Sequence, residues 1–347
     1  MFKFEEEITK SINLGIIPGL NYCVINSNEM FFGSLGNKQT CPFSISNSID
    51  TIYDIASLSK VVVTVTIISK LIDKASISIN DNVSKYLPRF KYDDITIFDL
   101  LTHTSGLPAD YNSKEIISKA LALDKVYSCD KEYETGSKVL YSDIGFILLG
   151  ELIEKVYNKS LDVVAMEEVF IPLEMNNTCY NPFKKDKCAP TEITIDRGMV
   201  KGIVHDEKAC SLGGVAGHAG VFTDIVDLSH FVSMIMNNGV YNNKKFLSKD
   251  IIDLWFKPLV YDKSADRYRS LCWIVGLNNV VINKNGNIIS FSGFTGPSIS
   301  IDRDNNISII LLTNRIHPSR NNKKYVPIRL SISDDIYNEL VKNKSRN

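Results

Sequence analysis

The sequence predicts an α+β protein in which a mainly helical lobe is inserted into a lobe built from both ends of the chain. The order of local patterns carries this prediction: a helix and strands come first, a long block of helical patterns follows, and strands with a closing helix return. The length of 347 residues allows for two such lobes. We therefore expect residues 1–70 and 271–347 to form an antiparallel sheet flanked by helices, and residues 71–270 to form an all-helical lobe, with a ligand site in the cleft between them.

The first lobe is predicted from short elements near the N-terminus. Residues 4–15 have the apolar spacing of an amphipathic helix, and Asn21–Ile25 and Met30–Ser34 are typical of strands joined by a polar turn. The segment Ala56–Asp73 contains no glycine or proline. Its β-branched residues favour a strand locally, but its length favours a buried helix.

The remaining elements follow from hydrophobic periodicity and from the positions of glycine and proline. Glycine and proline turns separate helical patterns between residues 75 and 270, with Ile144–Val156 and Ile225–Asn238 as clear examples. A closing helix is expected over Ile328–Lys344. The predicted strands before it are Leu271–Gly276, Val280–Asn283, Ile288–Ser292, Ser298–Asp302 and Ile307–Thr313.

Composition excludes several classes of function. The formal net charge is -1 with both signs spread along the chain, so we expect no nucleic-acid partner. Seven scattered cysteines without a C-x-x-C pair favour reduced thiols over a zinc site or a disulfide framework. The first residues are acidic and no apolar run could span a bilayer, so we expect a cytoplasmic protein without a membrane span. We also expect no cofactor, and the sequence does not predict the oligomeric state.

The first candidate for chemistry is the sequence Ser57-Leu58-Ser59-Lys60. Residues three apart share one face of a helix, so the Lys60 amine can reach the Ser57 hydroxyl. A serine hydroxyl is a weak nucleophile and needs an adjacent base. A lysine serves as that base only if burial or neighbouring cations lower its pKa. The same spacing also occurs by chance at ordinary helix starts.

Two further segments contain hydroxyl groups beside predicted elements. Tyr141 precedes a buried helix, a position that also suits core packing. The sequence Phe291-Ser292-Gly293-Phe294-Thr295-Gly296 ends a predicted strand, where glycines would let a substrate backbone lie close to the strand edge. A tight β-turn is the alternative interpretation.

The order of these segments resembles class C β-lactamases and related penicillin-binding-protein-like serine hydrolases. The three segments match an S-x-x-K motif, a Y-x-[ND] motif and a [KH]-[TS]-G-like triad. The resemblance covers about residues 15 to 340 and includes these further segments: Ile17–Gly19, Tyr53–Ala56, Leu100–Leu107, Val204–Glu207, Gly213–Gly220 and Thr313–Pro318. It implies the β-lactamase/D,D-peptidase fold.

The resemblance also implies roles for single residues. Ser57 matches the acylated nucleophile, Lys60 the lysine that helps to deprotonate it, and Tyr141 the proton shuttle to the leaving group. Asp143 lies where the family has Asn or Asp. The N–H groups of Ser57 and Phe294 match the oxyanion hole, in which one lost donor costs about 3 kcal/mol of barrier. The substrate would lie along Ser292, Gly293 and Phe294.

Two positions depart from the family pattern or add to it. Phe291 stands where the family usually has a lysine or histidine that attracts a substrate carboxylate, and Arg315 is a candidate replacement. Asp143 near Lys60 would favour the ammonium form. We therefore hypothesise that Lys60 is charged and supports Tyr141 as a phenolate base.

The histidines do not predict a metal site. His103, His205, His218 and His317 lack the helical pair spacing with an acidic third ligand that is typical of zinc sites. We expect His103 to brace a turn, and His205 either lies near the cleft or belongs to a surface turn.

The predicted function is that of a serine hydrolase acting through an acyl-Ser57 intermediate on an amide or ester. The resemblance implies β-lactams, D-amino peptides, muropeptides or small esters as substrates, and β-lactamase, D,D-carboxypeptidase or esterase activity. The alternative is a non-catalytic or slow-turnover penicillin- or peptide-binding protein of the same fold, because Phe291 lacks the usual charge.

Overall fold

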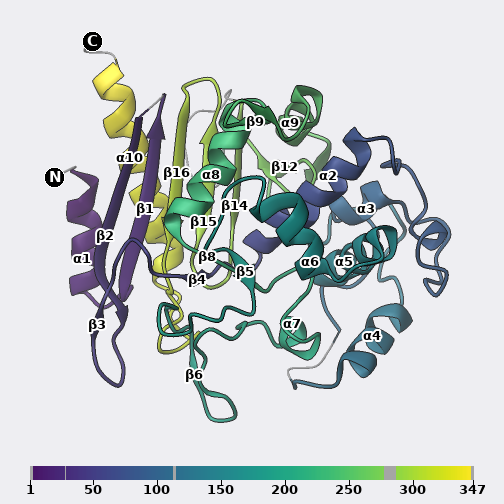
Figure 1. The fold of residues 1–347 in the computed structure, drawn as a ribbon, viewed down its shortest axis with the longest axis horizontal. Coiled ribbons are helices and arrows are strands. Elements are labelled where there is room, and N and C mark those ends of the chain that lie inside the picture. The colour runs from purple at the N-terminus through teal and green to yellow at the C-terminus, as the bar shows by residue number, and fades with distance from the viewer. Residues whose placement is uncertain (1–2, 28, 112–114, 277–286, 345–347) are drawn as a thin grey trace.

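A nine-stranded antiparallel sheet with helices on both faces dominates the part of the chain that the computed structural model describes, residues 3–27, 29–111, 115–276 and 287–344 (Figure 1). The strand order is β11-β12-β13-β14-β15-β16-β1-β2-β3. The strands are β1 (Gly19–Asn26), β2 (Glu29–Gln39), β3 (Ile45–Ser46), β11 (Val260–Asp262), β12 (Arg267–Arg269), β13 (Ile274–Val275), β14 (Ile288–Ser292), β15 (Ser298–Asp302) and β16 (Ile307–Leu312). The predicted α+β class with an antiparallel sheet is confirmed.

The helices and the smaller strands occupy the rest of the described chain. The helices are α1 (Phe4–Asn13), α2 (Thr66–Asp73), α3 (Ile97–Leu101), α4 (Lys119–Ser128), α5 (Asp143–Tyr157), α6 (Leu161–Ala165), α7 (Glu207–Ser211), α8 (Ile225–Met236), α9 (Lys249–Phe256) and α10 (Tyr325–Lys344), with π-helical η1 (Lys60–Val65) and η3 (Met166–Phe170) and 3-10 η2 (Val83–Lys85). The short strands are β4 (Tyr53–Asp54), β5 (Cys179–Tyr180), β6 (Ile193–Thr194), β7 (Gly198–Met199), β8 (Val221–Thr223), β9 (Val240–Tyr241) and β10 (Lys244–Lys245).

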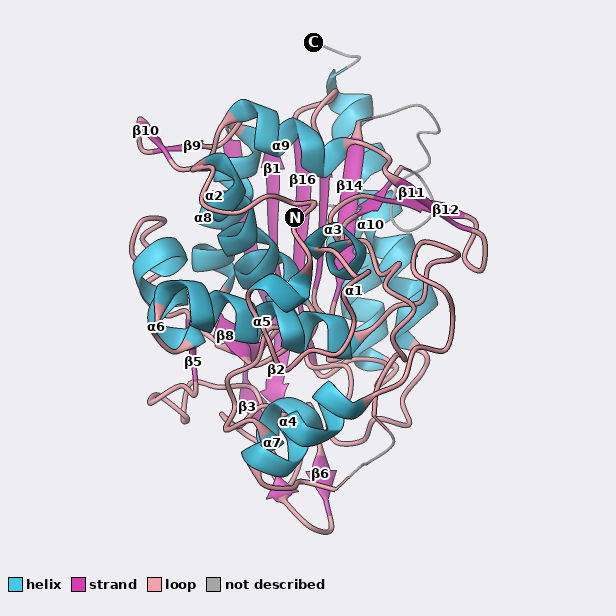
Figure 2. Cartoon of the chain, turned by 90° about the vertical axis from the view of Figure 1, so that its right-hand side faces the viewer, coloured by secondary structure: helices cyan, strands magenta, loops and turns pink. Residues whose placement is uncertain are grey.

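The large sheet separates two hydrophobic cores. Successive side chains of a strand point to opposite faces. On β1, Tyr22 and Val24 therefore join a core with α1 and α10, whereas Cys23 and Ile25 face the larger core on the other side. Figure 2 shows helices on both sides of the strands. The larger core also holds η1, α2 and α5, and it is the core on which the catalytic candidates rest.

Both chain ends contribute to the smaller core, as the order of patterns predicted. Helices α1 and α10 pack against each other, and the Lys3 amide donates to Glu339 Oε1 at 3.2 Å. Strands β1 and β16, which come from opposite ends of the chain, pair through six residue pairs from Asn21↔Leu312 to Asn26↔Ile307.

Several boundaries differ from the sequence-based expectation. The sheet already includes β11 and β12 before residue 271, and α8 packs against β1 and β16, so residues 71–270 are not separate from the sheet. In the predicted strand Leu271–Gly276 only β13 is extended, because Cys272 has a positive φ of 68°. The predicted strand Val280–Asn283 lies outside the described residues. Within the described helices, none combines the length and the apolar character needed to cross a bilayer.

The expected helix over Ala56–Asp73 is present with a local change of winding. It runs as η1 followed directly by α2. Single-turn π segments inside helices are frequent at functional sites. Lys60 is the first residue of this one.

Candidate active site

The ammonium group of Lys60 is the centre of the candidate site. The side chain is completely buried, and its Nζ donates to Ser57 Oγ at 3.2 Å, to Asp143 Oδ1 at 2.6 Å and to the His218 carbonyl oxygen at 3.2 Å. An ammonium group has three donors and no acceptor. Three acceptors around one nitrogen therefore fit the charged form, because a neutral amine would turn its lone pair toward one of them.

The pKa of Lys60 follows from the same contacts. Burial disfavours the charged form, but the charge and the hydrogen bond of Asp143, with a further contribution from the Tyr141 oxygen, outweigh burial and hold the pKa of Lys60 above its usual value. The first half of our hypothesis, a charged Lys60, agrees with this direction. While it is charged, Lys60 cannot accept the Ser57 proton.

The loop before Ser57 is held in a sparsely populated backbone conformation. Ala56 has a φ of 45°, in the left-handed region that non-glycine residues rarely adopt. The buried side chain of Asp54 secures it: Oδ1 accepts from the Ala56 amide at 2.8 Å and Oδ2 from the His205 amide at 2.7 Å. Strain of this kind persists where surrounding contacts over-determine it, and it clusters at functional sites.

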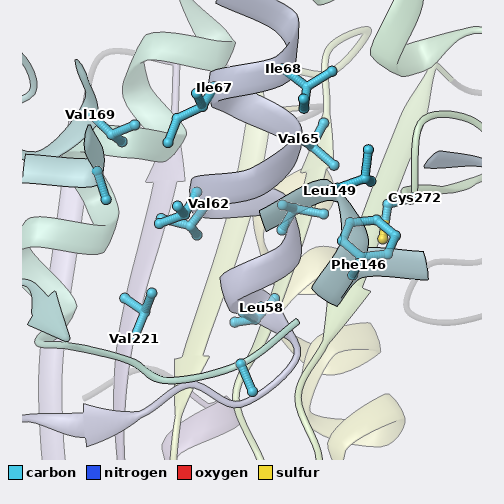
Figure 3. Packing of buried hydrophobic residues seen from close by; sticks show 14 of the residues in the cluster. Leu58, Val62, Val65, Ile67, Ile68, Phe146, Leu149, Val169, Val221 and Cys272 are labelled. Atoms are coloured by element: carbon cyan, nitrogen blue, oxygen red, sulfur yellow. The ribbon is translucent and has the colours of Figure 1, made fainter. Parts of the chain in front are cut away.

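A glycine contact brings the His218 carbonyl to Lys60. Helix α5 packs against η1, and Figure 3 shows Val62 and Val65 on the latter helix among buried side chains that include Phe146 and Leu149 of α5. A Cβ on Gly217 would lie 2.1 Å from the Phe146 carbonyl oxygen. The absence of a side chain at 217 therefore lets this segment reach both helices, and the Gly217 carbonyl accepts from Thr64 Oγ1 at 2.6 Å.

The same segment brings an aspartate–histidine pair to the site. His218 Nε2 lies 2.9 Å from Asp206 Oδ1, and the same oxygen accepts from the Ala209 amide at the start of α7. Burial raises the pKa of Asp206, but His218, the Ala209 amide and Lys60 together lower it well below its usual range. The sequence left the region of residue 206 open between the cleft and a surface turn, since nothing in the linear spacing pairs residue 206 with residue 218.

Tyr141 lies beside Lys60, on a loop that His103 orders. The Lys60 Nζ is 4.8 Å from the Tyr141 ring centroid, and the rings of His103 and Tyr141 are 4.5 Å apart. His103 has a positive φ of 60°, and its Nδ1 accepts from the Ser142 amide at 3.1 Å. It therefore braces a turn, as expected from the sequence.

The second half of the phenolate hypothesis does not agree with the structure of the resting site. Burial raises the pKa of Tyr141, and although Lys60 lowers it, the net direction is upward. Tyr141 is therefore a neutral phenol at neutral pH. Burial is the main reason, and Asp143, which compensates the ammonium charge on which the hypothesis relied, adds to it.

The end of β14 docks onto the loop that precedes Ser57. A Cβ on Gly293 would lie 2.4 Å from the Ile55 carbonyl oxygen, so only glycine permits this approach. Thr295 Oγ1 donates to the Asp54 carbonyl at 2.7 Å. Within the described residues, no hydrogen bond uses the amides of Ser57 or Phe294, the two predicted oxyanion-hole donors.

The comparisons with known proteins agree with this geometry. A family model described as Beta-lactamase matches residues 8–331. The chain belongs to the β-lactamase family. A relative from Salmonella enteritidis, named for D-alanyl-D-alanine carboxypeptidase activity, is 31% identical over 356 aligned residues that cover 91% of this chain and 81% of the relative. The resemblance inferred from the motifs is confirmed.

Solved structures of low identity share the fold of this β-lactamase family member. A class C β-lactamase matches with a TM-score of 0.78 and 18% identity, covering 96% of this chain and 94% of the other. EstCE1, a hydrolase with promiscuous acyltransferase activity, matches with a TM-score of 0.77 and 18% identity, covering 95% of this chain and 97% of the other.

The position at which this β-lactamase family member departs from the usual pattern is buried. Phe291 packs against Trp273 with ring centroids 6.3 Å apart, and only 4% of it is exposed. The next residue, Ser292, is partly buried and pairs with Ser298 of β15. Strand β14 therefore presents no cation where the family usually has one.

Arg315 does not fit the predicted role of carboxylate anchor. Its Nε donates to the Phe294 carbonyl at 2.8 Å, its Nη1 donates to the Asn322 carbonyl at 2.7 Å, and the side chain is buried. The guanidinium also stacks 4.8 Å from the Phe294 ring centroid, and the other stacking partner of this ring is His205 at 5.7 Å. Arg315 thus braces the Phe294 loop.

One group of side chains has the spacing of metal ligands. Asp143, Asp206 and His218 place one ligand atom each within 4.8 Å of one another. The Lys60 ammonium bonded to Asp143 already supplies the positive charge that these carboxylates need, so we assign the group to the ion-pair network of Lys60. The prediction that the protein needs no metal or cofactor stays a prediction.

Proposed function

We propose that this protein is a serine hydrolase that forms an acyl-enzyme at Ser57. One observation carries the proposal: the buried Lys60 ammonium donates to the partly exposed Ser57 hydroxyl, while the Tyr141 ring lies 4.8 Å from the same ammonium. These are the residue types that nucleophilic catalysis requires, a nucleophile with a proton acceptor close by.

Acylation would begin from the form in which Tyr141 has released its proton to solvent, and it would proceed in two steps. Ser57 Oγ forms a bond to the substrate carbonyl carbon, and its proton passes to the deprotonated Tyr141 oxygen. The bond from the carbonyl carbon to the leaving nitrogen or oxygen then breaks, and Tyr141 returns the proton to that atom. Lys60 stays an ammonium and stabilises both the serine oxygen and the tyrosine oxygen as they gain negative charge.

Deacylation would reverse the roles. A water molecule gives its proton to Tyr141 and its oxygen to the acyl carbon, and Ser57 Oγ leaves with the proton that Tyr141 returns. The amides of Ser57 and Phe294 would donate to the carbonyl oxygen in both steps, because neither amide makes a hydrogen bond among the described residues.

The proposed acyl donor is a D-amino peptide, with a small ester or β-lactam as the next candidates. The relative from Salmonella is named for a D-alanyl-D-alanine carboxypeptidase, and EstCE1 is described as a hydrolase with acyltransferase activity. We propose a reducing, cytoplasmic environment, in which a muropeptide fragment is a more accessible substrate than intact cell wall. All seven cysteines are free, which supports that environment.

Covalent labelling tests the nucleophile. Incubation with a fluorophosphonate, followed by intact mass measurement and peptide mapping, is expected to show one adduct at Ser57 that Ser57→Ala abolishes. Ser59→Ala is the matched control, because its hydroxyl is completely buried and bonds to the Val221 amide at 3.1 Å. Labelling of the Ser57→Ala variant at another residue would contradict the proposal.

A slow-turnover binding protein is the second candidate, favoured by the uncharged Phe291 and by the raised pKa of Tyr141. The lifetime of the adduct separates the two functions. A panel of chromogenic esters, a cephalosporin and D-Ala-D-Ala peptides is expected to give repeated turnover. An adduct that persists with every substrate would instead identify a binding protein or sensor.

A further inference from the structure

Strand β12 directs two arginines toward the candidate site. Arg267 and Arg269 are two residues apart, so their side chains leave the strand on the same face, while Tyr268 between them is half exposed on the other. The Arg269 guanidinium lies 5.8 Å from the centroid of the Tyr141 ring, and 2% of Arg269 is exposed. An arginine remains charged under all ordinary conditions.

Two contacts fix the Arg269 guanidinium in this place. Its Nε donates to Asp262 Oδ2 at 3.3 Å, and its Nη1 donates to the Cys272 carbonyl at 3.5 Å. Asp262 belongs to the neighbouring strand β11, where it lies opposite Arg267. The positive charge is therefore held in place from the sheet.

We propose that Arg269 supplies from β12 the positive charge that β14 lacks at Phe291, and that it acts as a positioning residue for proton release from Tyr141. The inference rests on the proposed function, in which Tyr141 must give up its proton before it can receive that of Ser57. Lys60 alone leaves this difficult, because Asp143 compensates its charge at 2.6 Å.

Besides Arg267 on the same strand, whose charge also interacts with Tyr141, the titratable groups around Tyr141 come from four further places in the chain. Lys60 of η1 is positive, and Asp143 at the start of α5 is its partner. His103, after α3, has a pKa well below its usual value, first because of burial and then because of the charge of Arg269. Burial raises the pKa of Cys272, in the turn after β12, to about 12. Both are therefore neutral at neutral pH.

Arg269 lies farther from its carboxylate partner, Asp262, than Lys60 lies from Asp143. Asp262 is ionised, since its arginine partners and Ser264 outweigh burial and lower its pKa, but it lies 3.3 Å from Arg269 and 3.6 Å from Arg267. One carboxylate is shared between two guanidinium groups. This leaves Arg269 less compensated than Lys60.

The test uses two variants that break the same ion pair with opposite effects on charge. Arg269→Gln removes the cation. The midpoint, which is the pH at which the rate of Ser57 acylation reaches half of its maximum, should therefore move up by about one unit. Asp262→Asn leaves Arg269 charged and uncompensated, so the same midpoint should move down. Acylation of the folded variants is measured with a fluorophosphonate and with a neutral ester across pH.

Three controls keep the result specific. Arg269→Lys retains the charge and should return the midpoint most of the way. Arg303→Gln breaks an ion pair with Asp253, 2.8 Å long, on the β15–β16 turn, and should leave the midpoint unchanged. Melting temperatures of all variants report the structural cost, which should be larger for Asp262→Asn, because it breaks the ion pairs with both Arg269 and Arg267, than for Arg269→Gln, which breaks one.

The outcomes separate this inference from the proposed function. Wild-type protein without a Ser57 adduct at any pH would overturn both. Wild-type labelling combined with unchanged midpoints, or with shifts of the same sign in both variants, would overturn the role of Arg269 alone. A loss confined to carboxylate-bearing substrates would make Arg269 a substrate anchor, which also contradicts its action through Tyr141.

Discussion

The ion pair between Lys60 and Asp143 determines how the site responds to substitution. Asp143→Asn leaves a buried ammonium without its carboxylate at 2.6 Å, and we expect a loss of about 3 kcal/mol in the free energy of unfolding. Because the pKa of Lys60 is raised in the folded protein, this stabilisation is complete below the unfolded pKa of about 10.4 and declines as pH rises beyond it.

Urea denaturation at matched pH measures this difference. The free energy of unfolding of the wild type should exceed that of the Asp143→Asn variant by the same amount between about pH 6 and pH 9, and by less above about pH 11. Asp130→Asn is the control, because Asp130 pairs with Lys91 on the surface and should matter little at any pH. A difference that already falls through neutral pH would contradict the assignment of the charge to Lys60.

Phe291 gives a second prediction at the scale of the residue. A lysine there would restore the usual family residue but bury an ammonium against Trp273, and we expect Phe291→Lys to lose about 3 kcal/mol of stability. With Arg269 already supplying a cation, turnover of D-Ala-D-Ala peptides should not increase. Phe291→Leu, which conserves the apolar character, should lose less. Higher peptidase activity in Phe291→Lys would show that the site lacked a charge.

At the scale of elements, the contact between α5 and residue 217 holds the site together. Two glycines of α5 differ in their surroundings: a Cβ on Gly150 would lie 3.0 Å from the Gly217 amide nitrogen, whereas the nearest atom to one on Gly145 is a flexible Leu100 side chain at 3.4 Å. Gly150→Ala should therefore push the His218 segment away from Lys60, lowering both stability and the rate of Ser57 acylation.

Gly145→Ala is the matched substitution within the same helix. Alanine favours helix by about 1 kcal/mol over glycine, so this variant should be as stable as the wild type or slightly more stable, with unchanged acylation. Thermal unfolding and fluorophosphonate labelling measure both variants. Equal effects at the two positions would mean that the close approach at residue 217 does not constrain the site.

Periodicity predicted most of these elements, and contact across the chain explains what it missed. The strand patterns of Ile288–Ser292 and Ser298–Asp302 predicted β14 and β15, and length correctly favoured a helix in which Val61 to Val65 are all buried. The spacing of Ser57 and Lys60 indicated their contact. Arg269 gave no signal, because a three-residue strand is too short to show a period and its approach to Tyr141 depends on the sheet.

At the scale of the molecule, the sheet separates the core that supports the site from the core built by the chain ends. Ile332 of α10 is fully buried in the latter. Ile332→Ala should lower the free energy of unfolding by about 3 kcal/mol while the folded protein keeps its rate of acylation. Denaturation and labelling below the transition measure the two effects separately.

Val62→Ala tests the other side of the sheet. Val62 is fully buried in η1, two residues after Lys60, so this variant should lose both stability and acylation rate. Val326→Ala, at a half-exposed position of α10, is the control and should change the free energy of unfolding by less than about 0.5 kcal/mol. Impaired acylation in Ile332→Ala would show that the two cores are coupled.

The two outermost strands of the large sheet, β3 and β11, are short. β3 has two residues and β11 has three, whereas β2 has eleven, of which only Asn37 and Gln39 pair with β3. A short terminal strand offers few unpaired backbone groups to an incoming chain. Self-association by strand addition is therefore disfavoured at the β11 margin, whereas at the opposite margin the length of β2 that β3 leaves uncovered is where an incoming strand would find unpaired backbone groups.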